Sequence, residues 1–153
     1  MTLDAALQGV DDACLRHLAG YQAAQADIAL KRAFHARIGE PFGLRPVEFT
    51  ILALVAHNPG VTGKQLAQAL AVTAPNITLL LDRMSERGLV ERVRSETDRR
   101  AQNIHLTRAG AALAQRTLAV SRTMEREVLG HLSEGERVML LELLRKVARQ
   151  PRE

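Results

Sequence analysis

Arginine side chains gather in one stretch of the sequence. The 153-residue chain has 21 Lys and Arg against 17 Asp and Glu, a formal net charge of +4. Much of the arginine lies between residues 83 and 108, at Arg83, Arg87, Arg92, Arg94, Arg99, Arg100 and Arg108. Clustered guanidinium groups are the electrostatic footprint of a protein that binds a polyanion. A solvated charged face is the alternative, because basic stretches are common on soluble proteins, and charge alone leaves both interpretations open.

Side chains that could support catalysis or bind a metal are scattered. No two histidines combine the i, i+3 or i, i+4 spacing of helical metal ligands with a third ligand nearby; they are His17, His35, His57, His105 and His131. The sequence has no glycine-rich phosphate loop, no nucleophile elbow and no carboxylate pair in an apolar setting. These observations predict a protein that is not an enzyme and has neither a metal site nor a cofactor.

Composition narrows the class of protein further. The single cysteine, Cys14, excludes an internal disulfide and favours a reducing, cytoplasmic compartment. Residues 1–30 carry acidic side chains and lack an uninterrupted apolar core, which predicts neither a secretion signal nor a membrane span. An apolar content of 46% with only 3% aromatic residues predicts an α-rich fold with an aliphatic core.

The first part of the chain reads as two helices. Residues 3–38 contain no proline and carry apolar residues near heptad spacing, which predicts one long helix with a kink or frayed start near its glycines. Residues 39–46 predict a loop, and Pro46 suits the first position of a second helix that runs to about His57. The predicted core face of that helix consists of Phe49, Leu52 and Ala53.

Two short helices and a hairpin follow. Thr62 and Gln65 form a predicted capping box for a helix through Leu70, and Thr73 is the predicted cap of a fourth helix that ends at Gly88. Its apolar face is Ile77, Leu80, Leu81 and Met84. Residues 89–94 and 103–106 alternate like strands around a polar tip that is longer than a tight turn requires, which suggests that the tip reaches a partner.

The last part of the chain predicts two more helices. Thr107 caps the first, whose apolar positions continue to Leu132, and Ser133 with Glu136 makes a capping box for the last. Residues 3–38 and 107–150 carry more apolar surface than the domain of about 60 residues between them could cover, so we expect a second chain to cover the remainder.

The order of these elements and three motifs resemble the MarR (multiple antibiotic resistance regulator) family. The motifs are Leu89-Val90-Glu91-Arg92, Asp98-Arg99-Arg100-Ala101 and Leu106-Thr107-Arg108-Ala109-Gly110, with Leu66-Ala67 to Leu70 before the turn. The resemblance implies a mainly α fold with a small β-hairpin wing, in a single domain spanning residues 1–153. Residues 46–106 would form the winged helix-turn-helix, and residues 1–38 and 107–150 the dimerisation lobe. A homodimer would place two fourth helices roughly 34 Å apart on a pseudo-palindromic site in double-stranded DNA.

The fourth helix has the size that fits a major groove, and its first turns would face base edges. Thr73, Asn76 and Thr78 are the candidate readers, with Pro75 in the same turn, and ordinary capping and solvation is the alternative for them. Leu79 stands where many relatives have a polar residue, so it either contacts thymine methyl groups or packs against the neighbouring helix. The candidate phosphate contacts are Lys64, Arg83 and Arg94.

The resemblance also assigns the hairpin tip. In relatives an arginine of this tip enters the minor groove, and the matching segment here is Asp98-Arg99-Arg100. We expect Arg100 in the groove, where the negative potential of A·T-rich DNA favours it, with Asp98 orienting the loop. A mobile charged tip is the alternative.

Relatives accept small aromatic or phenolic acids that lower their DNA affinity. His17, Tyr21, His35 and Phe49 are the candidate ligand contacts here, although each also fits a core or surface role. Some relatives sense peroxide through a first-helix cysteine with nearby tyrosines, but Tyr21 is the only tyrosine, so we expect Cys14 to be a packed core thiol.

The sequence therefore predicts a dimeric repressor that a small aromatic effector releases from DNA. An effector-independent or architectural DNA-binding protein is the first alternative. A winged-helix module for protein interaction is the second.

Overall fold

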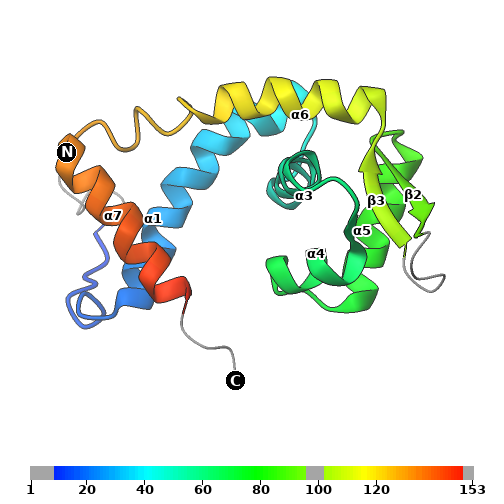
Figure 1. Ribbon diagram of the computed structural model, residues 1–153. Coiled ribbons are helices and arrows are strands. Elements are labelled where there is room, and N and C mark those ends of the chain that lie inside the picture. The colour runs from blue at the N-terminus through cyan, green and yellow to red at the C-terminus, as the bar shows by residue number, and fades with distance from the viewer. Residues whose placement is uncertain (1–8, 96–101, 150–153) are drawn as a thin grey trace. The chain divides into compact units, whose positions relative to one another are not determined.

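The computed structural model describes residues 9–95 and 102–149, and the chain divides into two compact units. One unit is Met1–Ala33 with Glu125–Glu153, and the other is Phe34–Met124. Figure 1 labels their helices and strands. We call them the terminal unit and the winged unit.

The winged unit is a helix-turn-helix with a three-stranded antiparallel sheet. Its elements are η2 (His35–Gly39, a π-helix), α2 (Glu40–Phe42), α3 (Pro46–His57), β1 (Val61–Thr62), α4 (Gly63–Leu70), α5 (Ala74–Glu86), β2 (Val90–Arg94), β3 (Gln102–Leu106) and α6 (Arg108–Ser121). The strand order is β1-β3-β2, with Val61 opposite Ile104 and Arg92 on the other side of Ile104. The predicted mainly helical fold with a hairpin wing is confirmed, whereas the two-residue strand β1 was not predicted.

Aliphatic side chains from every layer of the winged unit meet in one core. Ile38, Ile51, Leu66, Met84 and Ile104 are almost completely buried. The predicted core face of α3 is only partly right. Leu52 is buried, but the other buried apolar residues of α3 are Ile51 and Val55, while Phe49 and Ala53 are half-buried. The helix is packed on more than one side, so the narrow predicted stripe understates its burial.

The start of α6 is fixed against the end of α5 by Thr107 and Gly110. The Thr107 hydroxyl accepts from the amide of Gly110 (3.0 Å) and donates to the carbonyl of Gly88 (2.5 Å). A Cβ atom on Gly110 would lie 1.9 Å from the carbonyl oxygen of Leu89, a distance that no side chain can occupy. The Leu-Thr-x-x-Gly motif therefore has a steric reason, which is the close approach of two backbones.

The helix predicted over residues 3–38, with a kink or frayed start near its glycines, begins late in the structure, and its first residues, 3–8, lie outside the described residues. Helix α1 spans Ala19–Phe34, and residues 9–18 form turns and loop. Asp11 accepts from the amide of Ala13, and Asp12 accepts from Arg16 and Tyr21, so these carboxylates support local turns instead of helix. At the other end the chain stays helical through η2 and α2, and Gly43 at φ +62° ends it, so the loop predicted from residue 39 begins only there.

The helix predicted to continue to Leu132 is also shorter. Helix α6 ends at Ser121, and residues 122–132 form turns. The hydroxyls of Ser121 and Thr123 donate to the carbonyls of Leu118 and Val120, an alternative to helical pairing that the apolar pattern does not reveal.

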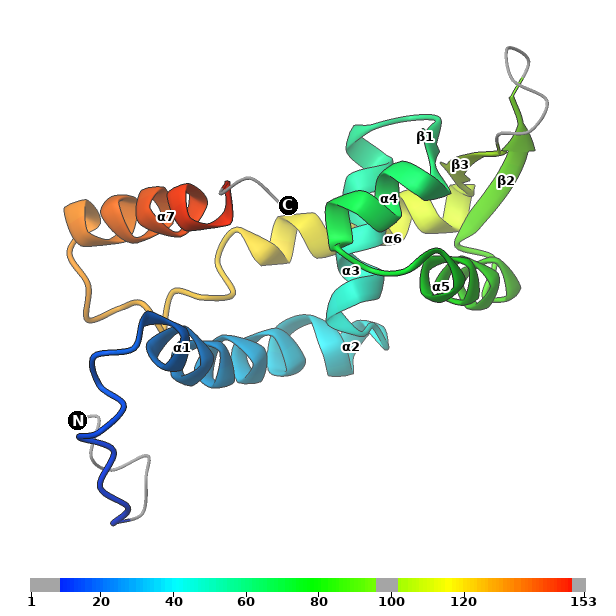
Figure 2. The same ribbon diagram turned by 90° about the horizontal axis from the view of Figure 1, so that it is seen from below.

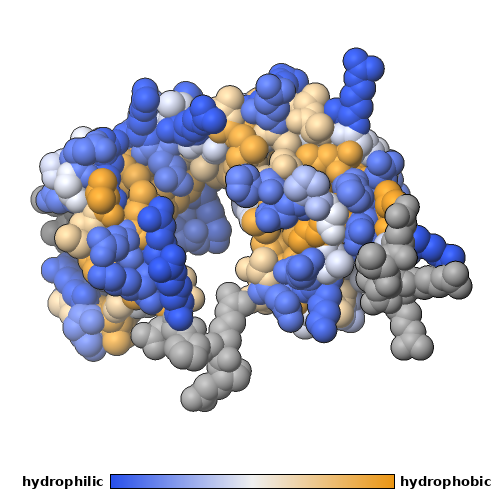
Figure 3. Space-filling view, viewed as in Figure 1, coloured by the Kyte–Doolittle hydropathy of each residue, from blue (hydrophilic) through white to orange (hydrophobic). Residues whose placement is uncertain are grey.

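The terminal unit contains most of α1 and the last helix, α7 (Glu134–Ala148). The predicted capping box of α7 is present, because Ser133 accepts from the amide of Glu136 and Glu136 accepts from the amide of Ser133. None of the α7 residues is buried within the single chain, and Figure 3 shows hydrophobic surface in this part of the molecule. The exposed large apolar side chains of α7 are Val138, Met139, Leu140, Leu141, Leu143, Leu144 and Val147. Among the described residues, no helix is long and apolar enough to cross a membrane.

Candidate nucleic-acid interface

Helix α5 starts with a geometry that leaves its first side chains outside. Thr73 is the N-cap residue, with extended backbone angles of −71° and 155°, and Pro75 occupies the first turn. In the described part of the chain the Thr73 side chain makes no cap hydrogen bond, so the predicted side-chain cap is wrong and only the cap position is right. Pro75 has no amide hydrogen to donate to a capping hydroxyl, which removes one of the usual partners.

The two faces of α5 differ as the periodicity predicts. Ile77, Leu81 and Met84 are buried, and Leu80 is half-buried. The predicted DNA-facing residues Thr73, Pro75, Asn76, Thr78 and Arg83 are all exposed. The Thr78 hydroxyl donates to the carbonyl of Ala74 (2.9 Å), so its oxygen can still accept a hydrogen bond from a ligand.

The exposure of Leu79 bears on one of its two interpretations, packing inside the protein. Its side chain is 49% exposed, on a helix whose core face is buried. Leu79 therefore does not pack into the core of the winged unit. An exposed leucine beside Asn76 and Thr78 is an apolar contact surface, and the methyl group of thymine is the apolar group that a major groove offers.

Helix α4 precedes α5 through a tight turn. The capping box of Thr62 and Gln65 is present as predicted, with the amide of Gln65 donating to the Thr62 hydroxyl (3.2 Å). Lys64 is exposed in the first turn of α4. Ala71 follows the helix with φ +53°, and the amide of Val72 donates to the carbonyl of Ala67 (3.0 Å), which closes the turn.

Of the wing residues predicted to contact DNA, one lies among the described residues. Arg94 is exposed at the end of β2, opposite Gln102. Arg99 and Arg100, together with Asp98, lie in residues 96–101, outside the described residues, so the prediction of a minor-groove arginine stays a prediction.

Arg92 joins the wing to α5, and the sequence reasoning did not single it out. Its Nη1 lies 2.7 Å from Oδ1 of Asp82, and its Nη2 donates to the carbonyl of Thr78 (3.3 Å). Figures 1 and 2 show strand β2 beside α5, which agrees with the contacts between these elements. The two partners lie 10 and 14 residues upstream of Arg92, so no local spacing rule could have paired them.

Glu48 forms a second long-range polar bridge, which the sequence did not predict. Its side chain is 5% exposed, and it accepts from the amide of Arg45 (2.8 Å) and from Nη2 of Arg45 (3.1 Å). Nη1 of Arg87 lies 3.3 Å away, and Nη2 of Arg87 donates to the carbonyl of Gly43 (2.9 Å). Burial acts to raise the pKa of Glu48, but the hydrogen bonds and charges of Arg45 and Arg87 outweigh it and lower the pKa. Arg87 thus ties the end of α5 to the start of α3.

The predicted ligand contacts do not all fall in one unit. His17 and Tyr21 belong to the terminal unit, and His35 and Phe49 to the winged unit. The Tyr21 hydroxyl donates to Asp12 (3.1 Å), and the centroid of the Phe49 ring lies 5.7 Å from the centroid of the Phe34 ring. Each of these two side chains therefore contacts a residue of its own unit. His17 and His35 are exposed.

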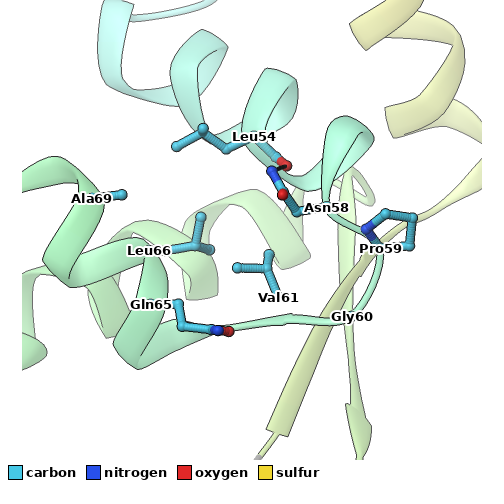
Figure 4. A pocket seen from close by; sticks show the side chains of 8 residues that line it. All are labelled: Leu54, Asn58, Pro59, Gly60, Val61, Gln65, Leu66 and Ala69. Atoms are coloured by element: carbon cyan, nitrogen blue, oxygen red, sulfur yellow. Dashed lines mark hydrogen bonds between the residues drawn. The ribbon is translucent and has the colours of Figure 1, made fainter.

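Two open hollows of the winged unit are lined by other residues. One of about 450 Å³ lies between the end of α3, the turn that follows it and α4 (Figure 4). Its lining is Leu54, Asn58, Pro59, Gly60, Val61, Gln65, Leu66 and Ala69. A second, of about 470 Å³, lies between α3, β3 and α6.

The structure describes the surroundings of Cys14 and of most side chains that could bind a metal. Cys14 is exposed in the single chain, so its expected place as a packed core thiol is wrong here. The turn at residues 9–18 replaces the helix whose apolar stripe would have buried it. Across residues 9–95 and 102–149, no group of three His, Cys, Asp or Glu side chains is placed to hold a metal ion.

A model of the MarR family matches residues 42–101, which cover the helix-turn-helix and strand β2 and end just before β3. The chain is 34% identical over 135 residues to a putative transcriptional regulatory protein for the hcr operon of Thauera aromatica, covering 88% of this chain and 81% of that protein. The chain belongs to the MarR family. Its relatives in this family are transcription regulators with a winged-helix fold.

Solved structures agree with this membership. The transcriptional repressor CouR, bound to a 23-mer DNA duplex, is 31% identical with a TM-score of 0.84, covering 92% of this chain and 99% of that one. The structure of BpsR from Bordetella bronchiseptica has a TM-score of 0.80. The DNA binding of that protein is regulated by 6-hydroxynicotinic acid. BpsR is 21% identical, covering 88% of this chain and 96% of that one, and at this identity the likeness shows the MarR fold alone.

Proposed function

We propose that this MarR-family chain is a homodimeric transcription repressor that reads double-stranded DNA with α5 in the major groove. The observation that carries the proposal is the outward face of α5, where Asn76, Thr78 and Leu79 are exposed opposite the apolar face of Ile77, Leu81 and Met84 that is buried in the core. Asn76 offers an amide that can bond bidentately to adenine, and Leu79 offers contact to a thymine methyl group. CouR, which shares 31% of its sequence, is a repressor whose structure contains DNA.

Phosphate contacts would supply much of the affinity. Lys64, Arg83 and Arg94 are exposed on α4, α5 and β2 of the winged unit. Arg99 and Arg100 would add the minor-groove contact at the wing tip. A protein with few charged base readers depends on such contacts, so its binding should weaken steeply as salt rises.

The terminal unit supports the homodimer. Its last helix leaves apolar side chains exposed along its length, and monomeric proteins rarely expose a contiguous apolar surface of that kind. A two-fold interface buries the same surface on both chains, and it would give two α5 helices for the two half-sites of a pseudo-palindromic operator.

The experiment is fluorescence anisotropy of the full-length protein against the DNA upstream of its own coding region and against a scrambled duplex, at two salt concentrations. We expect tight binding to the first duplex only, weakened by salt. Asn76→Ala should cost roughly 1–3 kcal/mol on the selected site and relax specificity there. Ser85→Ala, an exposed position further along α5, is the matched control and should bind like wild type.

The other outcomes would assign a different function. Equal, weak binding to both duplexes, unchanged by Asn76→Ala, would favour an architectural DNA-binding protein. The absence of any DNA affinity, with no effect of Arg100→Ala, would favour a protein-interaction module.

The small effector is a further part of the proposal. BpsR shows that this fold can accommodate regulation of DNA binding by a small aromatic acid. An effector acts only through different affinities for the DNA-competent and DNA-incompetent states. Titration of the protein–DNA complex with benzoate and with 6-hydroxynicotinate should release the DNA. DNA affinity that is unchanged by such acids would favour the effector-independent regulator.

A further inference from the structure

The contact between the wing and α5 depends on a directional side-chain bridge. The core face of α5 is apolar, and its burial places the helix against the core of the winged unit. Arg92 reaches across from β2 with two donors on a rigid planar group, one to the carboxylate of Asp82 and one to the carbonyl of Thr78. Two hydrogen bonds from the rigid fork of one guanidinium group to two different acceptors restrict the orientation of both partners.

The strand that carries Arg92 is itself firmly placed. Arg92 stands opposite Ile104 of β3, whose side chain is buried in the core, and β3 also pairs with β1. The carbonyl that Arg92 contacts belongs to Thr78, between Ile77 of the core face and Leu79 of the exposed face. The bridge therefore connects a fixed strand to the turn of α5 that carries the candidate base readers.

We propose that Arg92 is a positioning residue for sequence readout, which sets the rotation of α5 relative to the wing and does not itself bind DNA. The proposal rests on the proposed DNA-binding function. Its partner Asp82 shares the role, although Asp82 adds a negative charge to a surface that would face a polyanion.

The negative charge of Asp82 allows a test in which two explanations predict opposite changes in DNA affinity. If only net electrostatics mattered, Asp82→Asn would strengthen DNA binding, because it removes an acid from a DNA-facing helix. If Asp82 positions α5 through Arg92, the same change weakens binding to the selected sequence. Glu86→Gln is the matched control, since Glu86 is an exposed acid one turn further along α5 and the change removes the same charge.

The experiment uses full-length protein and a duplex that the wild type selects from a randomised library, with a scrambled duplex as reference. We expect Asp82→Asn and Arg92→Met each to lower the ratio of selected to scrambled affinity about tenfold. The double variant should be no worse than Arg92→Met alone, because both changes break one bridge. Arg92→Lys should restore binding only in part, since a lysine cannot present the planar fork.

The salt dependence separates positioning from direct contact. The slope of log affinity against log salt should be the same for Arg92→Met and wild type. Arg126→Met, which removes one arginine charge from the terminal unit, is its charge-matched control and should keep the wild-type ratio. A slope smaller by about one, with equal loss on both duplexes, would show that Arg92 is a phosphate contact and overturn the proposal.

Each failure has its own signature. Asp82→Asn that behaves like Glu86→Gln overturns the positioning role, and this comparison holds even if Arg92→Met does not fold. A wild type that selects no sequence from the library is a failure of the proposed function, and it is seen without any variant. Melting temperatures within a few degrees of wild type confirm that the affinities compare folded proteins.

Discussion

The winged unit and the terminal unit use apolar residues in opposite ways. The winged unit buries its large aliphatic side chains within one chain, around Ile38, Ile51 and Met84, and adds polar bridges at its edges. The terminal unit leaves Leu141 and Leu144 of α7, and Ile28 of α1, about half exposed. A unit that satisfies its own core can fold alone, whereas one that exposes this much apolar surface needs a partner surface.

The largest expected effect comes from substitutions in the exposed apolar face of α7. Leu141→Asp with Leu144→Asp should dissociate the proposed dimer, because each leucine contributes about 1.5–3 kcal/mol when it is buried in an interface. Sedimentation velocity should show monomers at concentrations where the wild type is dimeric, while circular dichroism should still show a folded winged unit. Glu142→Gln, on the same helix, removes only an exposed ion pair with Lys146 and should leave the dimer intact. Dimers that persist in the double variant would refute α7 as the interface.

The winged unit should lose stability at a different kind of position, where two backbone segments pack closely together. Gly110→Ala places a Cβ atom 1.9 Å from the Leu89 carbonyl oxygen, so α6 must shift away from the wing. We expect a loss of about 3 kcal/mol in the free energy of unfolding, measured by urea denaturation. Gly135→Ala is the matched control in α7, where a Cβ atom meets nothing within 4 Å. That control should be neutral or stabilising by up to about 1 kcal/mol, and an equal loss in both variants would contradict the steric argument.

The sequence predicted features that depend on residues close together in the chain. The capping residues Thr62, Thr107 and Ser133 each accept the expected amide hydrogen bond, and the buried face of α5 follows the helical period. These features depend on side chains three or four residues apart, which a sequence displays directly.

The errors have physical causes that a single sequence hides. The glycines predicted a kink or frayed start of the first helix, but periodicity does not report the competing hydrogen bonds of Asp11 and Asp12 that accompany its late start. The bridges of Arg87 to Glu48 and of Arg92 to Asp82 join residues that only the fold brings together. The base contacts of α5 remain predictions because they concern a partner molecule, and the wing-tip arginines remain predictions because they lie outside the described residues.

The smallest expected effect concerns the polar bridge at Glu48, which makes part of the winged unit sensitive to acid. Its pKa is lowered in the folded state, so its contribution is complete above the pKa of an unfolded glutamate, about 4.3, and is lost as pH falls through the lower folded value. Glu48→Gln should cost about 1–2 kcal/mol of unfolding free energy at pH 7, a modest figure because the side chains of Arg45 and Arg87 are 51% and 40% exposed.

Urea denaturation of wild type and Glu48→Gln at pH 7, 5 and 3 measures this contribution. The difference between the two proteins should be constant from pH 7 to 5 and shrink at pH 3, because protonation then removes the charge from the wild type as well. Glu86→Gln, at an exposed position, should show no comparable pH-dependent difference. A difference that stays the same at pH 3 would mean that Glu48 stabilises the winged unit through its shape and neutral hydrogen bonds, and that Arg45 and Arg87 contribute little through charge.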